Sequence, residues 1–301
     1  MLAPFKVLIL DDHPLCCEHA RSLLMEAGLT DTHMACNARE ALEKLGDGGF
    51  HLVITDLKMG AKDGIDVLRR TKLLVLCYPN SPTGKTATVD FYKRVIDFAR
   101  ANKIVVIQDA AHSLLSYDRK PLSFLEVPGA KEVGVEVHSM SKGFHMIGWR
   151  MGFVAGHEKI VQAFADVKDN SDSGQFMAVQ KAAAAALDDA SIPEAVREKY
   201  RRRLTKLVET LSRCGFDCKM PGGTYFLYTK SPKGLADGTK FDNAEAAGQY
   251  LITEHSIVTV PWDDAGPHLR FSVTYEAADE RAEDELMRAT AERLSRIQPV
   301  F

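Results

Sequence analysis

Lys142 lies among small and hydroxyl residues in the stretch that runs from Ser139 to Gly152. A lysine held at a strand end among such neighbours can lose solvation and act as a nucleophilic amine toward a carbonyl carbon. The hydroxyls of Ser139 and Ser141 and the guanidinium of Arg150 can hold a phosphate, the arginine through two parallel hydrogen bonds. The stretch therefore favours a Schiff-base lysine beside a phosphate site; the alternative is a surface lysine in a Ser/Gly loop.

Two apolar segments upstream also end in polar side chains. Residues 73–77 run into a Pro/Asn/Gly turn that carries Asn80, and residues 104–107 are followed closely by the carboxylate of Asp109. Both segments have the apolar character of buried strands. Because the carboxyl ends of parallel strands meet at one crevice, we expect Asn80, Asp109 and Lys142 to lie together there.

These residues together resemble the fold-type I pyridoxal-phosphate (PLP) aminotransferases of class I/II, nearest to those acting on alanine-type or LL-diaminopimelate substrates. The resemblance implies that Lys142 binds the cofactor covalently and shuttles a proton, and that Asp109 pairs with the ring nitrogen. It also implies that Asn80 hydrogen-bonds the phenolic oxygen of the ring. Ser139 and Arg150 would contact the phosphate.

The resemblance covers about residues 72–301 and includes Arg270. This residue matches the arginine that clamps the substrate α-carboxylate, a bidentate task that lysine would do poorly. His112 stands where the family usually has a tyrosine beside the phenolic oxygen, and its charge varies near neutral pH. The family's phosphate loop, stacking aromatic and N-terminal arm are not found before Leu73, so we expect weakened PLP binding and low activity.

The N-terminal part of the chain carries a different set of acids. Asp11 and Asp12 follow the apolar segment 5–10, and Asp56 follows the apolar segment 50–55. Carboxylates at neighbouring strand ends make an oxygen-rich site suited to Mg²⁺. The set resembles the receiver domain of two-component response regulators, which implies that Asp56 is the phosphoacceptor and that the three acids bind Mg²⁺ weakly.

The receiver pattern is only half present. It calls for a hydroxyl residue after the fourth strand and a lysine after the fifth, but Cys77 and Tyr78 occupy the first place and Asp109 the second. A complete phosphorylation switch is therefore not expected. The join near Thr71 has no Pro/Gly/Ser linker, which favours a chimera of two fragments that share one core.

The predicted fold class is α/β. We expect a doubly wound, mostly parallel sheet of strand order 2-1-3-4-5-6, in which flavodoxin-like strands are continued by PLP-transferase strands. An antiparallel strand at 151–155 should close the far edge, and an α+β small domain should follow. The expected units are a receiver-like half-domain at 1–71, a large-domain part at 72–200 and a small domain at 201–301.

Helical and strand patterns fill the C-terminal half. Residues 157–213 are predicted to form long helices, in which the basic run 200–204 is interpreted as a solvated face rather than a nucleic-acid site. Trp262 is assigned equally to substrate lining and to plain packing. In the small domain, strands are expected at 224–228, 257–260 and 269–273, and helices at 242–254 and 277–296.

Composition argues against several functional classes. With 301 residues and a formal net charge of −3, the chain gives no electrostatic case for binding nucleic acid or an anionic membrane. No signal peptide or membrane span is expected, so cytoplasmic residence is the default. The six cysteines lack paired spacing and are interpreted as reduced thiols.

The predicted function is PLP-dependent amino transfer between an amino acid and a 2-oxo acid, impaired by the missing N-terminal half of the cofactor site, in a chain that could form a homodimer. Two alternatives stay open. One is a non-catalytic chimera that carries a vestigial PLP site. The other is a signalling module phosphorylated at Asp56.

Overall fold

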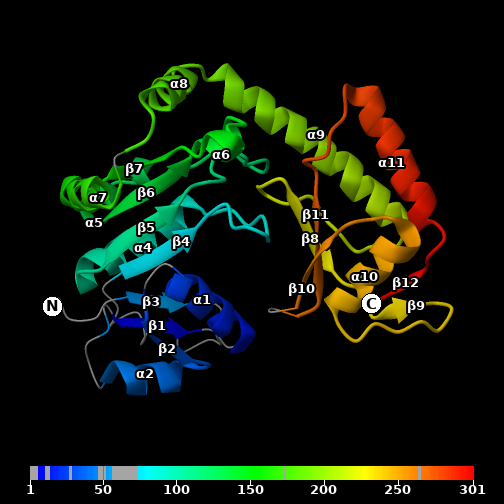
Figure 1. Ribbon diagram of the computed structural model, residues 1–301, viewed down its shortest axis with the longest axis horizontal. Helices are drawn as coiled ribbons and strands as arrows, with labels where there is room; N and C mark the ends of the chain where they lie inside the picture. Colours follow the sequence, from blue (N-terminus) through cyan, green and yellow to red (C-terminus); the bar gives the residue numbers. More distant parts are fainter. Residues whose placement is uncertain are drawn as a thin grey trace.

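The computed structural model begins with a small α/β unit, continues through a second sheet and ends in a C-terminal unit reached by one long helix (Figure 1). The structure describes residues 6–10, 14–26, 29–46, 50, 52–55, 73–172, 174–263 and 266–301.

The N-terminal unit is a three-stranded parallel sheet with a helix on each face. Its strand order is β2-β1-β3, the order expected for these three strands. Alternate residues of the central strand point to opposite faces: Leu8 packs toward Ala41 of the second helix, whereas Ile9 packs toward Cys17 of the first. The elements are β1 (Lys6–Leu10), α1 (Pro14–Glu26), β2 (Asp31–Ala35), α2 (Ala38–Gly46) and β3 (Leu52–Thr55).

The second sheet has the order β4-β5-β6-β7, with the first three strands parallel and β7 antiparallel. β4, β5 and β7 confirm the strands predicted at residues 73–77, 104–107 and 151–155. The elements are β4 (Leu73–Cys77), α4 (Val89–Asn102), β5 (Val105–Asp109), η1 (Phe124–Glu126), α5 (Ala130–Val133), β6 (Gly134–Ser139), α6 (Met140–Gly143), η2 (Ile147–Trp149) and β7 (Gly152–Gly156).

Helix α4 covers one face of this second sheet. Its N-terminus is capped by Thr88, whose hydroxyl accepts a hydrogen bond of 3.1 Å from the backbone N–H of Phe91. Tyr92 and Ile96 lie on the buried side of the helix at a spacing of about one turn. They pack in one apolar cluster with strand residues such as Leu76, which fixes α4 against the sheet.

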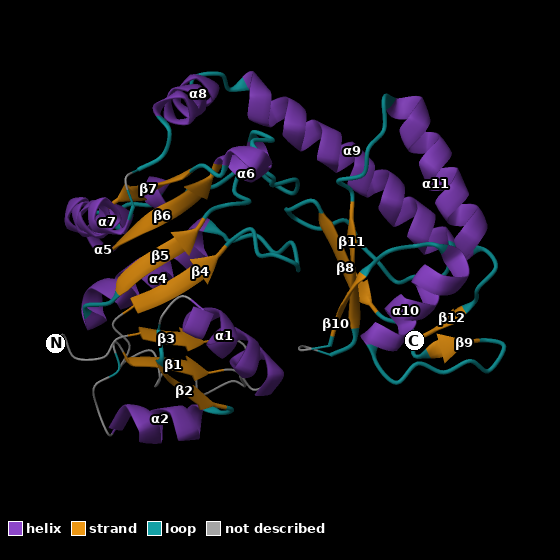
Figure 2. Ribbon diagram, viewed as in Figure 1, coloured by secondary structure: helices purple, strands orange, loops and turns teal. Residues whose placement is uncertain are grey.

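The prediction of one continuous sheet is wrong for the described strands. β3 contacts β4, but no ladder of backbone hydrogen bonds joins the two sheets. In Figure 2 the arrows of β3 and β4 diverge, so their backbone groups do not align as neighbouring strands must.

The C-terminal half contains three helices in sequence followed by small antiparallel sheets, of orders β10-β11-β8 and β12-β9. The elements are α7 (Glu158–Ser171), α8 (Met177–Leu187), α9 (Ser191–Arg213), β8 (Phe226–Lys230), β9 (Gly234–Leu235), α10 (Ala244–His255), β10 (Val260–Trp262), β11 (His268–Ser272), α11 (Glu280–Leu294) and β12 (Pro299–Val300). Helix α9 is continuous through the expected boundary between residues 200 and 201.

Two of the predicted strands lie about two residues later than expected. β8 begins at Phe226 because Thr224 has a φ of 69° and its N–H bonds the carbonyl of Leu115 instead of a neighbouring strand. β10 includes Pro261, which is tolerated because β10 is an edge strand and proline need not donate there.

The interpretation of residues 200–204 as a solvated face is wrong for three residues. Tyr200 is 4% exposed, Arg203 2% and Leu204 0%. Tyr200 and Leu204 belong to the C-terminal apolar core. Arg201 remains exposed and pairs with Glu198.

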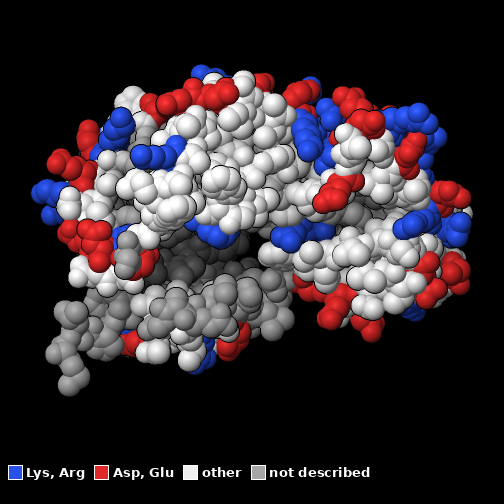
Figure 3. Space-filling view, turned by 45° about the horizontal axis from the view of Figure 1, so that its top comes forward, with Lys and Arg blue, Asp and Glu red and all other residues white. Residues whose placement is uncertain are grey.

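Charged side chains of both signs are mixed along the rim of the face drawn in Figure 3, and a wide uncharged area lies between them. On the described part of this face there is no extended patch of one sign. Within the described residues, no helix has both the length and the apolar character needed to cross a bilayer.

Candidate functional site

The candidate site begins where β4, β5 and β6 end. The register pairs Cys77 of β4 with Asp109 of β5, and Asp109 with Val137 of β6. Since the three strands are parallel, their carboxyl ends lie at one edge of the sheet, and the segments that follow them carry Asn80, His112 and Lys142.

Asp109 is partly buried at the last position of β5. Its carboxylate accepts a hydrogen bond of 2.9 Å from the backbone N–H of Ala111, which turns the chain out of the sheet. On the neighbouring strand, burial and the charge of Asp109 raise the pKa of the Cys77 thiol to about 11. Cys77 therefore stays a neutral thiol beside the carboxylate at physiological pH.

Lys142 is placed by a short helix that follows β6 directly. Ser139 caps this helix, α6, by accepting a hydrogen bond of 3.2 Å from the N–H of Ser141. Gly143 permits close packing, since a Cβ there would come within 2.7 Å of the Leu114 side chain. The Nζ of Lys142 lies 5.6 Å from the centre of the Tyr225 ring, a cation–π contact with the C-terminal half of the chain.

His112 contacts the same tyrosine ring. It is 7% exposed, and its ring meets that of Tyr225 edge-on at 5.3 Å. Burial, with the nearby charge of Lys142, lowers the pKa of His112 to about 4, so the imidazole is neutral at physiological pH. Its Nδ1 is buried and has no hydrogen-bond partner within the described residues.

Asn80 belongs to the turn after β4. Its side-chain oxygen accepts a hydrogen bond of 2.7 Å from the hydroxyl of Thr83, and its backbone carbonyl accepts one of 2.8 Å from the N–H of Gly84. Gly84 has a φ of 69° and lies against Pro221, where a Cβ would be 2.5 Å from the proline Cβ. The Asn80 turn is thus fixed against the C-terminal half.

The predicted phosphate ligands come from one short segment. Ser141 is 5% exposed, and the hydroxyl of Ser139 is engaged in capping α6. Arg150 is exposed, has a φ of 52° and donates a hydrogen bond of 3.2 Å to the carbonyl of Ile147. Met151, the residue after Arg150, is held against the start of α6, because its carbonyl accepts a hydrogen bond of 3.0 Å from the N–H of Met140.

Arg270 lies on β11. It contacts the ring of Phe226, whereas Lys142 contacts the neighbouring ring of Tyr225. Its guanidinium carbon lies 4.2 Å from the centre of the Phe226 ring and 5.6 Å from that of Trp262. Burial lowers the pKa of Arg270, and no carboxylate of the described residues forms an ion pair with it. A guanidinium held between two rings without a counter-ion is well placed to bind an anionic group.

The two rings that join these cations were not predicted as site residues. Tyr225 and Phe226 both lie within the strand expected at 224–228, and their ring centres lie 4.6 Å apart. The Pro221-Gly-Gly-Thr stretch just before them was the one available signal, because such a turn presents the next side chains at a loop edge. Trp262 contacts Arg270, which is consistent with both roles considered for it.

The predicted receiver acids, Asp11, Asp12 and Asp56, lie outside the described residues. Among the residues that are described, no group of three or more His, Cys, Asp or Glu side chains could hold a metal ion.

Comparison with known proteins identifies relatives for most of the chain. The family model described as "Aminotransferase class I and II" matches residues 39–286. The LL-diaminopimelate aminotransferase of Methanococcus maripaludis is 51% identical over 241 residues, covering 78% of this chain and 58% of that protein. The LL-diaminopimelate aminotransferase of Methanocaldococcus jannaschii is 56% identical over 215 residues, covering 71% of this chain and 51% of that protein.

Solved structures show the same architecture. The substrate-bound BacF structure from Bacillus subtilis superposes with a TM-score of 0.76 at 26% identity, covering 100% of this chain and 71% of that one. The chain spans between half and three fifths of the length of the two relatives it matches above. Because this family model matches residues 39–286, more than half of the chain, the chain belongs to the class I and II aminotransferases, a family whose members use pyridoxal phosphate.

Proposed function

We propose that this chain carries out PLP-dependent amino transfer from an amino acid of the LL-diaminopimelate type to a 2-oxo acid. One arrangement carries the proposal. Lys142 and Arg270 lie over the adjacent rings of Tyr225 and Phe226, so a nucleophilic amine and a free guanidinium share one site. The names of the two relatives that are 51% and 56% identical support the choice of amino donor.

The residues around Lys142 fit the cofactor. The buried Nδ1 of His112 lacks a partner among the described residues, and a cofactor oxygen would satisfy it. Asp109 would hold a proton at the ring nitrogen, and Asn80 would contact the phenolic oxygen beside His112. Bound PLP would supply an electron-withdrawing ring that stabilises negative charge at the substrate Cα.

The remaining roles follow from charge. Arg270 would hold the substrate α-carboxylate through two parallel hydrogen bonds. Lys142 would act as the general base that takes the proton from the substrate Cα. The donor leaves as a 2-oxo acid, and the amino group passes in a second half-reaction to the acceptor, which becomes an amino acid.

We further propose that the affinity for PLP is reduced. The phosphate contacts that we assign, Ser139, Ser141 and Arg150, all come from one segment, and Ser139 already caps α6. A phosphate held from one side loses the hydrogen bonds that a second loop would provide, each worth about 1.5–3 kcal/mol when charge-assisted.

Residues 1–71 are proposed to form a receiver-like half-domain, on the strength of the strand order β2-β1-β3. The family match beginning at residue 39 speaks against a boundary near Thr71. Incubation with Mg²⁺ and beryllofluoride tests the signalling role. A change in the amide NMR spectrum that Asp56→Asn abolishes would support phosphorylation at Asp56, and an unchanged spectrum would oppose it.

The amino-transfer proposal is tested by incubating the PLP-supplemented protein with LL-diaminopimelate and 2-oxoglutarate and measuring glutamate. We expect glutamate to form with the wild type and with Lys159→Ala, an exposed lysine of α7, but not with Lys142→Ala. Equal glutamate production by Lys142→Ala would overturn the assignment. No glutamate from any of the three proteins would favour the non-catalytic chimera.

A further inference from the structure

Helix α9 connects the two halves of the site through one of its turns. Tyr200 and Arg203 are three residues apart and therefore share a face of the helix. Tyr200 packs against Tyr225 with ring centres 5.2 Å apart and against His145, which follows α6, at 5.3 Å. One end of this turn thus contacts the segment that carries Lys142.

Arg203 makes the contacts at the other end of the turn. Its Nη1 donates to the carbonyl of Val273 at 3.1 Å and to that of Tyr275 at 2.6 Å, directly after β11. Its Nε donates to Glu283 of α11 at 2.7 Å, and the guanidinium lies 4.4 Å from the centre of the Tyr275 ring. One planar side chain therefore joins α9, the end of β11 and α11.

Val273 connects this arrangement to the site. Its N–H donates to the carbonyl of Tyr225 at 3.2 Å, while its own carbonyl accepts from Arg203. Val273 is 0% exposed, so water cannot replace the arginine as donor to that backbone group. Arg270 lies three residues earlier, on β11, and its guanidinium lies over the ring of Phe226, the residue next to Tyr225.

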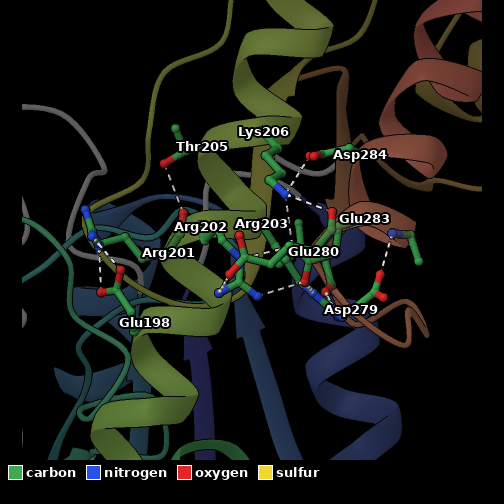
Figure 4. A network of polar contacts seen from close by, with 12 residues as sticks. Glu198, Arg201, Arg202, Arg203, Thr205, Lys206, Asp279, Glu280, Glu283 and Asp284 are labelled. Carbon is green, nitrogen blue, oxygen red and sulfur yellow. Dashed lines mark hydrogen bonds and ion pairs between the residues drawn. The ribbon is translucent and has the colours of Figure 1, made fainter.

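The neighbouring cations of α9 do not reach β11. Arg202 donates to both oxygens of Glu283 at 3.0 Å and pairs with Glu280 at 3.3 Å, and Lys206 pairs with Glu283 and Asp284. Figure 4 shows these side chains converging on Glu283 from α9 and α11. Arg203 also pairs with Glu283. Of the three cations Arg202, Arg203 and Lys206, it is the one that donates to the carbonyls of Val273 and Tyr275.

We propose that Arg203 is a positioning residue for substrate binding. By holding the carbonyls of Val273 and Tyr275, it fixes the register of β11 against β8. This register places Arg270 over the Phe226 ring, next to the Tyr225 ring that Lys142 contacts. The proposal rests on the proposed function, because it assigns Arg203 a role in presenting the carboxylate clamp. A lysine at this position would keep the charge for Glu283 but could not span three acceptors, since its ammonium is a point charge without the planar fork.

The test compares Arg203→Lys with Arg202→Lys. The second variant weakens the same ion pair to Glu283 and leaves the contacts to β11 intact. Hydrogen–deuterium exchange of the cofactor-free protein is followed for peptides covering 224–230 and 268–275. We expect the exchange rate of both peptides to rise at least about 10-fold in Arg203→Lys, which corresponds to a loss of about 1.4 kcal/mol of local stability. In Arg202→Lys the exchange rate should stay at the wild-type value.

The second readout is binding of 2-oxoglutarate to the PLP-supplemented protein, measured by calorimetry. We expect the dissociation constant to rise about 10-fold in Arg203→Lys and less than 2-fold in Arg202→Lys. Equal exchange in the two variants would overturn the positioning role whatever the cofactor does. If exchange rises in Arg203→Lys alone but the wild type binds no 2-oxoglutarate, the positioning of β11 by Arg203 stands and the proposed function fails.

Discussion

His112 is the site residue whose charge the fold changes most, because its pKa falls from an ordinary 6.5 to about 4. A histidine with a lowered folded pKa contributes its full stability above pH 6.5, and that stability is lost as the pH falls from 6.5 toward 4. We expect wild type to lose about 2 kcal/mol more unfolding free energy than His112→Gln between pH 7 and pH 5.

Urea denaturation at the two pH values measures this difference. Titration of every other group is common to wild type and variant, so the variant is its own control. An equal pH dependence in the two proteins would mean that His112 is protonated in the folded state at pH 5.

Arg270 is the residue on which substrate recognition depends. Arg270→Lys keeps the positive charge but loses bidentate bonding and the flat contact with Phe226. We expect the dissociation constant for 2-oxoglutarate to rise about 10- to 100-fold, with little change in melting temperature. The matched control is Arg201→Lys, an exposed arginine of α9 paired with Glu198, which should bind as wild type. Wild-type affinity in Arg270→Lys would place the carboxylate elsewhere.

Sequence reasoning found the site residues whose role is local and missed those whose role depends on distant partners. Asp109 and Lys142 follow apolar strands directly, so the strand pattern locates them. Tyr225 and Arg203 gave no such signal. Arg203 is buried only because Glu283 lies 80 residues away on a helix packed against it, and no local pattern encodes that distance.

At the scale of elements, the pairing of α9 with α11 depends on one buried carboxylate. Glu283 is 1% exposed, and hydrogen bonds from Arg202 and Arg203 lower its pKa to about 2. Glu283→Gln removes the counter-charge of three cations, so we expect a loss of about 3–5 kcal/mol in unfolding free energy at pH 7.

Glu285→Gln is the control for this change. Glu285 is exposed on the same helix and pairs with Arg281, a surface contact worth less than about 1 kcal/mol. If both variants unfold at the same urea concentration, the Glu283 cluster adds no stability to the helix pair.

The strands of the second sheet were predictable because each is a short apolar run closed by turn residues, and β7 at its edge by the glycines Gly152 and Gly156. The break between β3 and β4 was not predictable. Strand order follows from chain connectivity, but hydrogen bonding between two strands also requires matching twist and alignment, which depend on the packing of both sheets.

At the scale of the whole molecule, several apolar side chains on α7 and at the start of α8 lie in solvent. Phe164 is 48% exposed, Val167 65%, Phe176 75% and Met177 60%. Exposed apolar side chains of this kind are candidate contacts for a second copy of the chain. We expect sedimentation equilibrium at micromolar protein concentrations to show a dimer that Phe176→Ser weakens about 10-fold or more.

Val258→Ser is the control, since Val258 is 76% exposed on a distant surface of the small domain. It should associate as wild type does. If the wild type is a monomer at all accessible concentrations, the prediction of a dimer is wrong.

The central claim is that Lys142 lies in a site that still binds PLP. Its most direct test is the absorbance of the purified protein titrated with PLP, for wild type, Lys142→Ala and the exposed control Lys159→Ala. A covalent link between a lysine and PLP absorbs in the region of about 400–430 nm. The account predicts this band in wild type and Lys159→Ala and its loss in Lys142→Ala. A band of equal strength in Lys142→Ala, or no band in wild type, would contradict it.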